Sequence, residues 1–205
     1  IREFSQSIIS SILFFSNFFF LHENSYFFEK TIELPLIHTW SLSIEEQFYF
    51  VYPLIFSIFF LKRNLLIYFL SFVWVLSLLS CIYFSNLDLS LNFYLTTSRI
   101  WELLSGALTY LFLDKFKIKK NQLICYVGIL FIILSIFIFH EESKHPGILT
   151  LIPISGSVMI LIFSESNQNK NILNTRFLVF TGKISYSLYL SHYLVISTLK
   201  ILLIK

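Results

Sequence analysis

The sequence predicts an all-α protein, a polytopic bundle of transmembrane helices. Of its 205 residues, 56% are hydrophobic and 19% aromatic, while only 13% are charged. Soluble domains carry about twice that share of charged residues. The hydrophobic residues gather in runs that approach the roughly 20 residues needed to cross a bilayer. The net charge of +3 forms no basic stripe apart from these runs, so we expect a lipid bilayer and no nucleic acid as partner.

Membrane spans are expected wherever an apolar run is long enough. Six runs qualify, at about 44–61, 65–84, 99–113, 121–139, 148–163 and 184–204. The third is short, and the apolar stretch 91–95 before it can lengthen it. A seventh run, 7–21, is interrupted by serines and Asn17, so it either spans the membrane or lies re-entrant at its surface. The bundle therefore has six to seven membrane segments.

Local signals place the ends of some of these helices. Ser43 and Glu46 form a capping-box pattern, which predicts that the first long helix begins at about residue 44. Pro53 lies inside that helix and predicts a kink. Pro146 and Gly147 predict a turn before the span at 148–163.

The positive charges predict the orientation of the bundle. The loops around 62–63, 114–120 and 164–183 hold nine Lys or Arg, whereas the loops between them hold only Lys30 and Lys144. Basic loops remain in the cytoplasm. Residues 38–46 therefore lie on the extracytoplasmic side of an integral membrane protein.

A polar cluster precedes and enters the first long helix. Its members are His38, Trp40, Ser41, Glu45, Gln47 and Tyr49. Polar groups at the membrane boundary are costly, so they tend to be used in function. The spacing of Glu45, Tyr49 and Tyr52 places them on one helix face. The alternative is structural: a helix cap, with Trp40 in the interfacial aromatic belt.

Two charges stand in the span 99–113. Arg99 and Glu102 are spaced i, i+3 and can pair. A charge at the centre of a membrane helix costs about 2.5–3.5 kcal/mol and usually faces a bundle interior or a wet cavity. The alternative is a structural pair at the helix end, with Arg99 reaching toward water. Gly106, one turn further, permits the close approach of another helix.

The last span carries a polar face. Ser185, Tyr189 and His192 lie on it at helical spacing and favour a polar track through the membrane. Gly182 and Lys183 lie at the expected cytoplasmic end of this span. Lys183 can contact the phosphates of a donor there, or serve as a positive-inside anchor.

Other kinds of chemistry have no sequence support. Cys81 and Cys125 lie inside apolar runs and are expected to be core residues. His140 and His145 flank charged residues in a short loop, where a solvated turn is favoured over a metal site. We find no zinc-ligand spacing, glycine-rich phosphate loop or Gly-x-Ser-x-Gly element, so no metal is expected.

Three motifs together resemble a known family. They are His38-Thr-Trp40-Ser41-Leu-x-x-Glu45-Glu-Gln47-Phe-Tyr49, Arg99-x-x-Glu102-x-x-x-Gly106, and Gly182-Lys183-Ile-Ser185-Tyr-Ser-Leu-Tyr189-Leu-x-His192. In this order they resemble the membrane-bound acyltransferase-3 family, bacterial enzymes that O-acylate cell-surface carbohydrates. Ser191 stands where many members carry Trp.

The resemblance implies an activity and a larger domain. It implies transfer of an acyl group, commonly acetyl, from cytoplasmic acyl-CoA to a hydroxyl of an extracytoplasmic or lipid-linked carbohydrate, in the bacterial cytoplasmic (inner) membrane. The family domain has about ten helices, so 1–205 is expected to be an internal piece that lacks the N-terminal helices, with their catalytic Arg and His, and the last helix. Alone, this piece is expected to be inactive. Some relatives have a fused or separate extracytoplasmic esterase-like domain.

The resemblance also assigns roles to residues. The expected catalytic residues are His38, Glu45, Arg99 and Glu102. Substrate-binding roles are expected for Trp40, Ser41, Gln47, Tyr49, Ser185, Tyr189 and His192, and a donor-binding role for Lys183. Acyl-CoA, in the simplest case acetyl-CoA, is a substrate, and no permanently bound cofactor is expected.

Other functions are compatible with the same pattern. A transporter or flippase of lipid-linked saccharides can line its path with such polar residues. A non-enzymatic membrane subunit can use them to pack helices, although so polar a motif at the membrane boundary disfavours this. A polysaccharide polymerase is disfavoured because the loops 85–98 and 140–147 are short.

Overall fold

The described part of the chain is entirely helical. The structure is a computed structural model that describes residues 2–23, 34–116, 118–140, 143–164 and 172–203. Its elements are α1 (Arg2–Ile12), α2 (Ser16–His22), α3 (Thr39–Ile58), α4 (Arg63–Leu87), α5 (Leu89–Tyr94), α6 (Thr96–Lys115), α7 (Gln122–Ile138), η3 (Ile148–Thr150), α8 (Leu151–Phe163), η4 (Ile172–Asn174) and α9 (Arg176–Leu203). The all-α prediction is confirmed.

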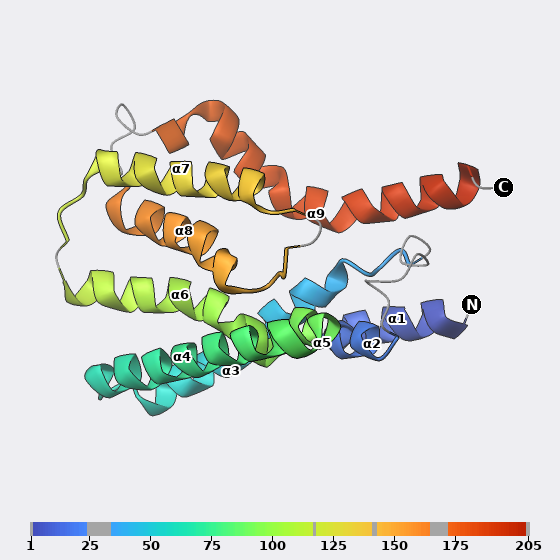
Figure 1. Cartoon of the computed structure of the whole chain (residues 1–205), viewed down its shortest axis with the longest axis horizontal. Coiled ribbons are helices and arrows are strands. Elements are labelled where there is room, and N and C mark those ends of the chain that lie inside the picture. Colours follow the sequence, from blue (N-terminus) through green and yellow to red (C-terminus); the bar gives the residue numbers. More distant parts are fainter. Residues whose placement is uncertain (1, 24–33, 117, 141–142, 165–171, 204–205) are drawn as a thin grey trace.

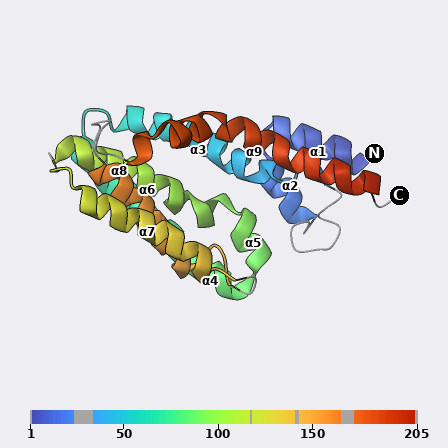
Figure 2. The same ribbon diagram turned by 90° about the horizontal axis from the view of Figure 1, so that it is seen from above.

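The helices pack in two groups that share α6. In one group α4 lies along α6, and α3 packs against both. In the other, α7 and α8 form a close pair that α6 joins through α8. Figure 2 places α3 and α9 on one side of the molecule and α4, α7 and α8 on the other.

The core of the first group is aliphatic and aromatic. Phe48 of α3, Leu66 and Leu70 of α4, and Leu104 and Leu108 of α6 are buried together. A second, smaller core joins α2 to the short helix α5 through Phe20, Ile37, Phe93 and Tyr94. The first core fixes the long helices, and the second fixes the shorter segments at one end of the bundle.

Sequence patterns misplaced the start of α3. The helix begins at Thr39, not at about 44, and the predicted capping box at Ser43 and Glu46 is wrong. Ser43 lies buried inside the helix, where its hydroxyl is hydrogen-bonded to the Ser16 hydroxyl at 2.7 Å. The Ser43 hydroxyl thus binds a residue of α2 and does not form the cap that the sequence pattern predicted.

Two other expected segments are divided. The run 7–21 forms α1 and α2, with Phe14 between them at a positive φ of 57°. The stretch 91–95 does not lengthen α6, because Leu95 is extended and ends α5. Asp88 caps α5 by accepting a hydrogen bond from the Leu91 amide at 3.0 Å.

The last helix begins earlier than expected. It starts at Arg176, eight residues before the expected 184. Gly182 and Lys183 therefore lie inside α9 and not at its end. The polar loop 164–176 falls mostly outside the described residues.

The loops separate into the two ends that the charge pattern predicts. At one end Arg63 pairs with Asp114, and the Lys115 ammonium donates to the Asn64 carbonyl at 2.9 Å. At the other, the Lys144 ammonium donates to the Asn86 carbonyl at 2.7 Å. The two sets of loops thus lie at opposite ends, while the direction in which the bundle faces stays a prediction.

Helix lengths alone identify fewer spans than the sequence pattern. Within the described residues, α4 is the one helix long and apolar enough to cross a membrane by the criteria of length and composition. The apolar helices Gln122–Ile138 and Ile148–Phe163 are shorter. Large side chains such as Phe50, 76% exposed, and Phe177, 75% exposed, cover outer helix faces, as expected where lipid is the solvent.

Two glycines allow α7 and α8 to touch. A Cβ at Gly128 would lie 2.6 Å from the Gly156 carbonyl oxygen, and a Cβ at Gly156 would lie 2.6 Å from the Gly128 carbonyl oxygen. Small residues at such positions let membrane helices approach closely. The described helices do not use the close approach that Gly106 permits, because no described atom lies within 4 Å of a Cβ built there.

We expect Gly128→Ala and Gly156→Ala each to destabilise the protein by about 1–3 kcal/mol, the usual cost of overpacking. Each added methyl meets a backbone oxygen, which can move only if the two helices separate. The measurement is the thermal unfolding midpoint of the detergent-solubilised protein.

Gly106→Ala is the matched control. Its methyl enters open space and improves helix propensity, so its midpoint should equal or exceed the wild-type value. If all three variants unfold at the same temperature, the close α7–α8 contact is not what stabilises this pair.

Candidate functional site

A cleft opens where the first turns of α3 meet α6. It is open to the surface on one side. Its lining is formed by Trp40, Ser41, Ile44, Glu45, Arg99, Glu102 and Leu103. Two of the three motifs singled out in the sequence thus form one site.

Arg99 is the most constrained residue of this cleft. Its side chain is 9% exposed, and its Nε donates to the Phe93 carbonyl at 3.2 Å. The guanidinium carbon lies 5.0 Å from the centroid of the Trp40 ring and 4.8 Å from that of Phe93. Cation–π contacts of this kind strengthen when water is excluded. Aromatic rings and a backbone carbonyl therefore fix the direction of the guanidinium.

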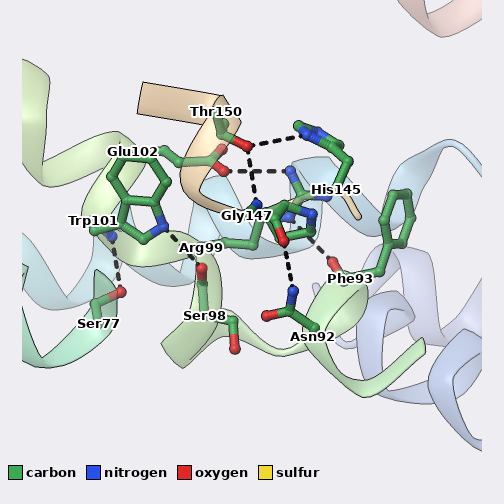
Figure 3. Close-up of polar contacts among 11 residues, drawn as sticks. Ser77, Asn92, Phe93, Ser98, Arg99, Trp101, Glu102, His145, Gly147 and Thr150 are labelled. Atoms are coloured by element: carbon green, nitrogen blue, oxygen red, sulfur yellow. Dashed lines mark hydrogen bonds and ion pairs between the residues drawn. The ribbon is translucent and has the colours of Figure 1, made fainter. Parts of the chain in front are cut away.

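Carboxylates flank this cation. The Glu102 carboxylate lies 3.5 Å from the Arg99 guanidinium, so the expected i, i+3 pair is confirmed (Figure 3). Glu45 is half-buried and lines the same cleft from α3. An arrangement of this kind can accept a proton on a carboxylate and stabilise a developing negative charge with the guanidinium.

The third motif reaches the same region through α9. The Tyr189 hydroxyl donates to the His38 carbonyl at 2.5 Å and is also hydrogen-bonded to the Ser41 hydroxyl. The ring centroids of Tyr189, His192 and Tyr193 each lie 5.6 Å from that of His38. The fold therefore brings His38 and Ser41 next to Tyr189 and His192. The two pairs are about 150 positions apart in the sequence.

Gln47 connects helices at one side of the cleft. Its amide nitrogen donates to the Phe14 carbonyl at 2.8 Å and to the Asn17 side-chain oxygen at 3.0 Å. Its carbonyl oxygen accepts from the Thr96 hydroxyl at 2.7 Å. The amide thus joins α2, α3 and α6, and its expected contact with substrate stays a prediction.

Three other expected site residues lie apart from the cleft lining. Tyr49 is 56% exposed on the outer face of α3. Ser185 is exposed and donates to the Gly182 carbonyl of its own helix at 2.8 Å. Lys183 is also exposed on α9. Their proposed contacts with substrate or donor stay predictions.

Sequence analysis missed a second group of residues near Arg99. Asn92 and Phe93 come from the short helix α5, and His145 and Thr150 from the segment before α8 (Figure 3). The Asn92 amide donates to the Pro146 carbonyl at 2.7 Å. The sequence signal for this group was Asn92, a polar residue within the otherwise apolar run 91–95.

His145 is held within this group. Its Nδ1 lies 3.1 Å from the Thr150 hydroxyl, which accepts a hydrogen bond from the Gly147 amide at 3.0 Å. Loss of solvation, and then the positive charge of Arg99, lower the pKa of His145 to about 4. The neutral ring accepting from Thr150 agrees with this direction. Lys144 and His145 remain exposed, as expected of a solvated turn, while Pro146 and Gly147 are buried.

A search of the described residues finds no group of three or more His, Cys, Asp or Glu side chains arranged to hold a metal ion.

Comparison with known sequences gives a family match over nearly the whole chain. Residues 5–205 match the acyltransferase-3 family, described as an acyltransferase domain. A Staphylococcus aureus (strain COL) protein provisionally named as an O-acetyltransferase is 34% identical over 209 residues, which cover 93% of this chain and 34% of that protein.

Further relatives carry a firmer name. The O-acetyltransferase OatA of S. aureus (strain NCTC 8325 / PS 47) is 29% identical over 213 residues, 96% of this chain and 35% of OatA. The chain thus spans about a third of the length of these relatives. No solved structure matches it significantly.

The pKa of His145 predicts a pH-dependent stability. An unfolded His titrates near 6.5, so as the pH falls from about 6.5 toward 4 the unfolded state binds a proton that the folded state resists. The stability contributed by neutral His145 is therefore complete above pH 6.5 and is lost between these values.

We expect His145→Gln to show a smaller fall in thermal midpoint than the wild-type protein between pH 7.5 and pH 4.5, measured in detergent. The substitution removes the titration, while groups elsewhere still respond to pH in both proteins. Equal falls in the two proteins would contradict the assigned environment of His145.

Proposed function

The chain belongs to the acyltransferase-3 family, and from this premise we propose that it supplies part of the active site of a membrane O-acyltransferase. The reaction would move an acyl group, in the simplest case acetyl, from acyl-CoA to a hydroxyl of an extracytoplasmic or lipid-linked carbohydrate. The family match over residues 5–205 and the relatives named O-acetyltransferases support the reaction type. The observation that carries the proposal is Arg99, held against two neighbouring aromatic rings and beside Glu102 in a cleft that Glu45 also lines.

The reaction needs two things that such a cleft can supply. The acceptor oxygen attacks the thioester carbonyl, a C–O bond forms, the C–S bond breaks, and coenzyme A leaves as a thiol after it takes up a proton. A base must remove the hydroxyl proton, and a donor must stabilise the oxyanion of the tetrahedral intermediate. In our proposal Arg99 stabilises that oxyanion, or a donor phosphate, and Glu102 orients Arg99.

Glu45 and His38 would serve the acceptor side. Glu45 faces the cleft with a carboxylate that can accept a hydrogen bond from a sugar hydroxyl or orient the base. The base itself is expected, from the family resemblance, to be a histidine on a segment outside 1–205. Trp40, Ser41, Tyr189 and His192 would form the surrounding acceptor site, since aromatic and hydroxyl groups suit a carbohydrate.

The membrane setting completes the proposal. Six to seven segments of this chain would lie in the bacterial cytoplasmic membrane, with His38–Glu46 on the extracytoplasmic side and the basic loops in the cytoplasm. Lys183 would anchor α9 at the cytoplasmic side or contact the donor phosphates. Donor and acceptor would then approach from opposite sides, so the thioester end of acyl-CoA would have to reach the cleft through the bundle.

We expect Arg99→Ala and Glu45→Gln, each made in the full-length protein, to lower acyl transfer at least about 100-fold, the typical loss when a stabilising donor is removed from an acyl-transfer site. Transfer is measured as incorporation of label from labelled acetyl-CoA into carbohydrate by isolated membranes. Immunoblotting of the same membranes corrects for protein level.

Glu46→Gln is the matched control, because it makes the same chemical change next to Glu45 at a residue that does not line the cleft. It should keep transfer within about twofold of the wild-type rate. Wild-type transfer by both cleft variants would remove the site assignment. Movement of a lipid-linked saccharide without any acylated product would instead favour a transporter.

A further inference from the structure

A buried asparagine connects two segments that are far apart in sequence. Asn92 of α5 is completely buried, and its amide donates to the Pro146 carbonyl at 2.7 Å. Pro146 is itself fully buried. We call residues 143–150 the α7–α8 segment. A buried amide is costly unless it is hydrogen-bonded, so this contact stabilises one particular docking of that segment. Figure 3 shows the Asn92 amide bonded to this segment near Arg99.

The helix that carries Asn92 also holds Arg99. The Phe93 carbonyl accepts from the Arg99 Nε, and the Phe93 ring lies under the guanidinium. The next carbonyl, that of Tyr94, accepts from the Asn17 amide at 3.1 Å. A helix of six residues is too short to be stable alone, so the position of α5 depends on these contacts.

The α7–α8 segment is ordered by its own hydrogen bonds before it meets Asn92. Thr150 is 4% exposed and contacts both the Gly147 amide and the His145 ring. His145 lies close enough to Arg99 for the positive charge to act on it. The segment therefore has hydrogen bonds of its own besides the one from Asn92, and it lies near Arg99.

We propose that Asn92 is a positioning residue: it locks the α7–α8 segment onto α5 and thereby keeps Arg99 aimed at Glu102 and the cleft. Without the amide, α5 and the segment separate, water enters, and the Phe93 carbonyl no longer holds the guanidinium in one direction. The effect on catalysis rests on the proposed acyl transfer. The effect on burial does not.

The catalytic test compares Asn92→Ala with Asn86→Ala in the full-length protein. Asn86 is the matched control, because it also contacts this segment, through Lys144, but at an exposed position. We expect Asn92→Ala to lower kcat for acetyl transfer about 10- to 100-fold, as small misplacements in a site do, with the KM for acetyl-CoA within about twofold. Asn86→Ala should change neither, and Asn92→Ser, which keeps a shorter donor, should restore part of kcat.

The burial test needs no activity. Cys81 is fully buried next to Asn92 and Trp101, and Cys125 is buried on α7. N-ethylmaleimide should label Cys81 faster in Asn92→Ala than in the wild-type protein, with Cys125 labelled equally slowly in both, as read from the labelled peptides by mass spectrometry. Asn86→Ala should label neither faster.

The outcomes separate the two proposals. Unchanged Cys81 labelling in Asn92→Ala would overturn the positioning role, and so would faster labelling with wild-type kcat. If both cysteines of Asn92→Ala label rapidly, that variant is unfolded, and the positioning role is then tested with Asn92→Ser. A wild-type kcat in Asn92→Ser overturns the proposal. An intermediate kcat supports it. If the wild-type protein itself transfers no acyl group, the proposed function fails, and Cys81 labelling alone decides whether Asn92 holds the segment.

Discussion

The constraint on which this site depends is the cost of a guanidinium inside an apolar helix bundle. In a medium of low dielectric constant a single charge is strongly unfavourable, and a partner repays that cost only with good geometry. Arg99 meets the condition with several weak partners at once: a carbonyl, two aromatic rings and a carboxylate. Since these partners belong to Trp40 of α3, Phe93 of α5 and Glu102 of α6, placing one charge requires three helices to meet at a defined point.

Polar side chains elsewhere in the bundle form hydrogen bonds that hold the start of α6 near Arg99. The side chains of Gln47 and Asn17 are hydrogen-bonded to each other, and the Gln47 carbonyl oxygen accepts from the Thr96 hydroxyl. Thr96 is the first residue of α6, three residues before Arg99. On α4, which packs along α6, the Ser77 hydroxyl donates to the Thr97 carbonyl at 2.6 Å and accepts from the Trp101 backbone amide. The start of α6 is therefore fixed from two sides by hydrogen bonds that lipid cannot replace. The cleft is rigid where the charge sits.

Periodicity and motifs predicted the helices and half of the site, and they failed where tertiary partners decide. The Arg99–Glu102 pair and the approach of Tyr189 to the Ser41 motif follow from i, i+3 spacing and from the family resemblance. The start of α3 does not, because Ser43 pairs with Ser16 on another helix and not with its own backbone. Asn92 could not be predicted for the same reason: its partner, Pro146, lies 54 residues away in a loop whose docking no local pattern encodes.

The contrast between α6 and α9 suggests how the work of the bundle is divided. The α6 side of the cleft has a buried aliphatic core beneath it and hydrogen bonds around it, so its groups are preorganised. The α9 side meets α3 through one tyrosine hydroxyl and a cluster of rings around His38, while most of α9 leaves its apolar side chains exposed. Among the described residues, the α9 side of the site therefore has fewer buried contacts than the α6 side. In the proposed reaction the preorganised α6 side would stabilise the developing charge, and the less tightly packed α9 side would contact the acceptor.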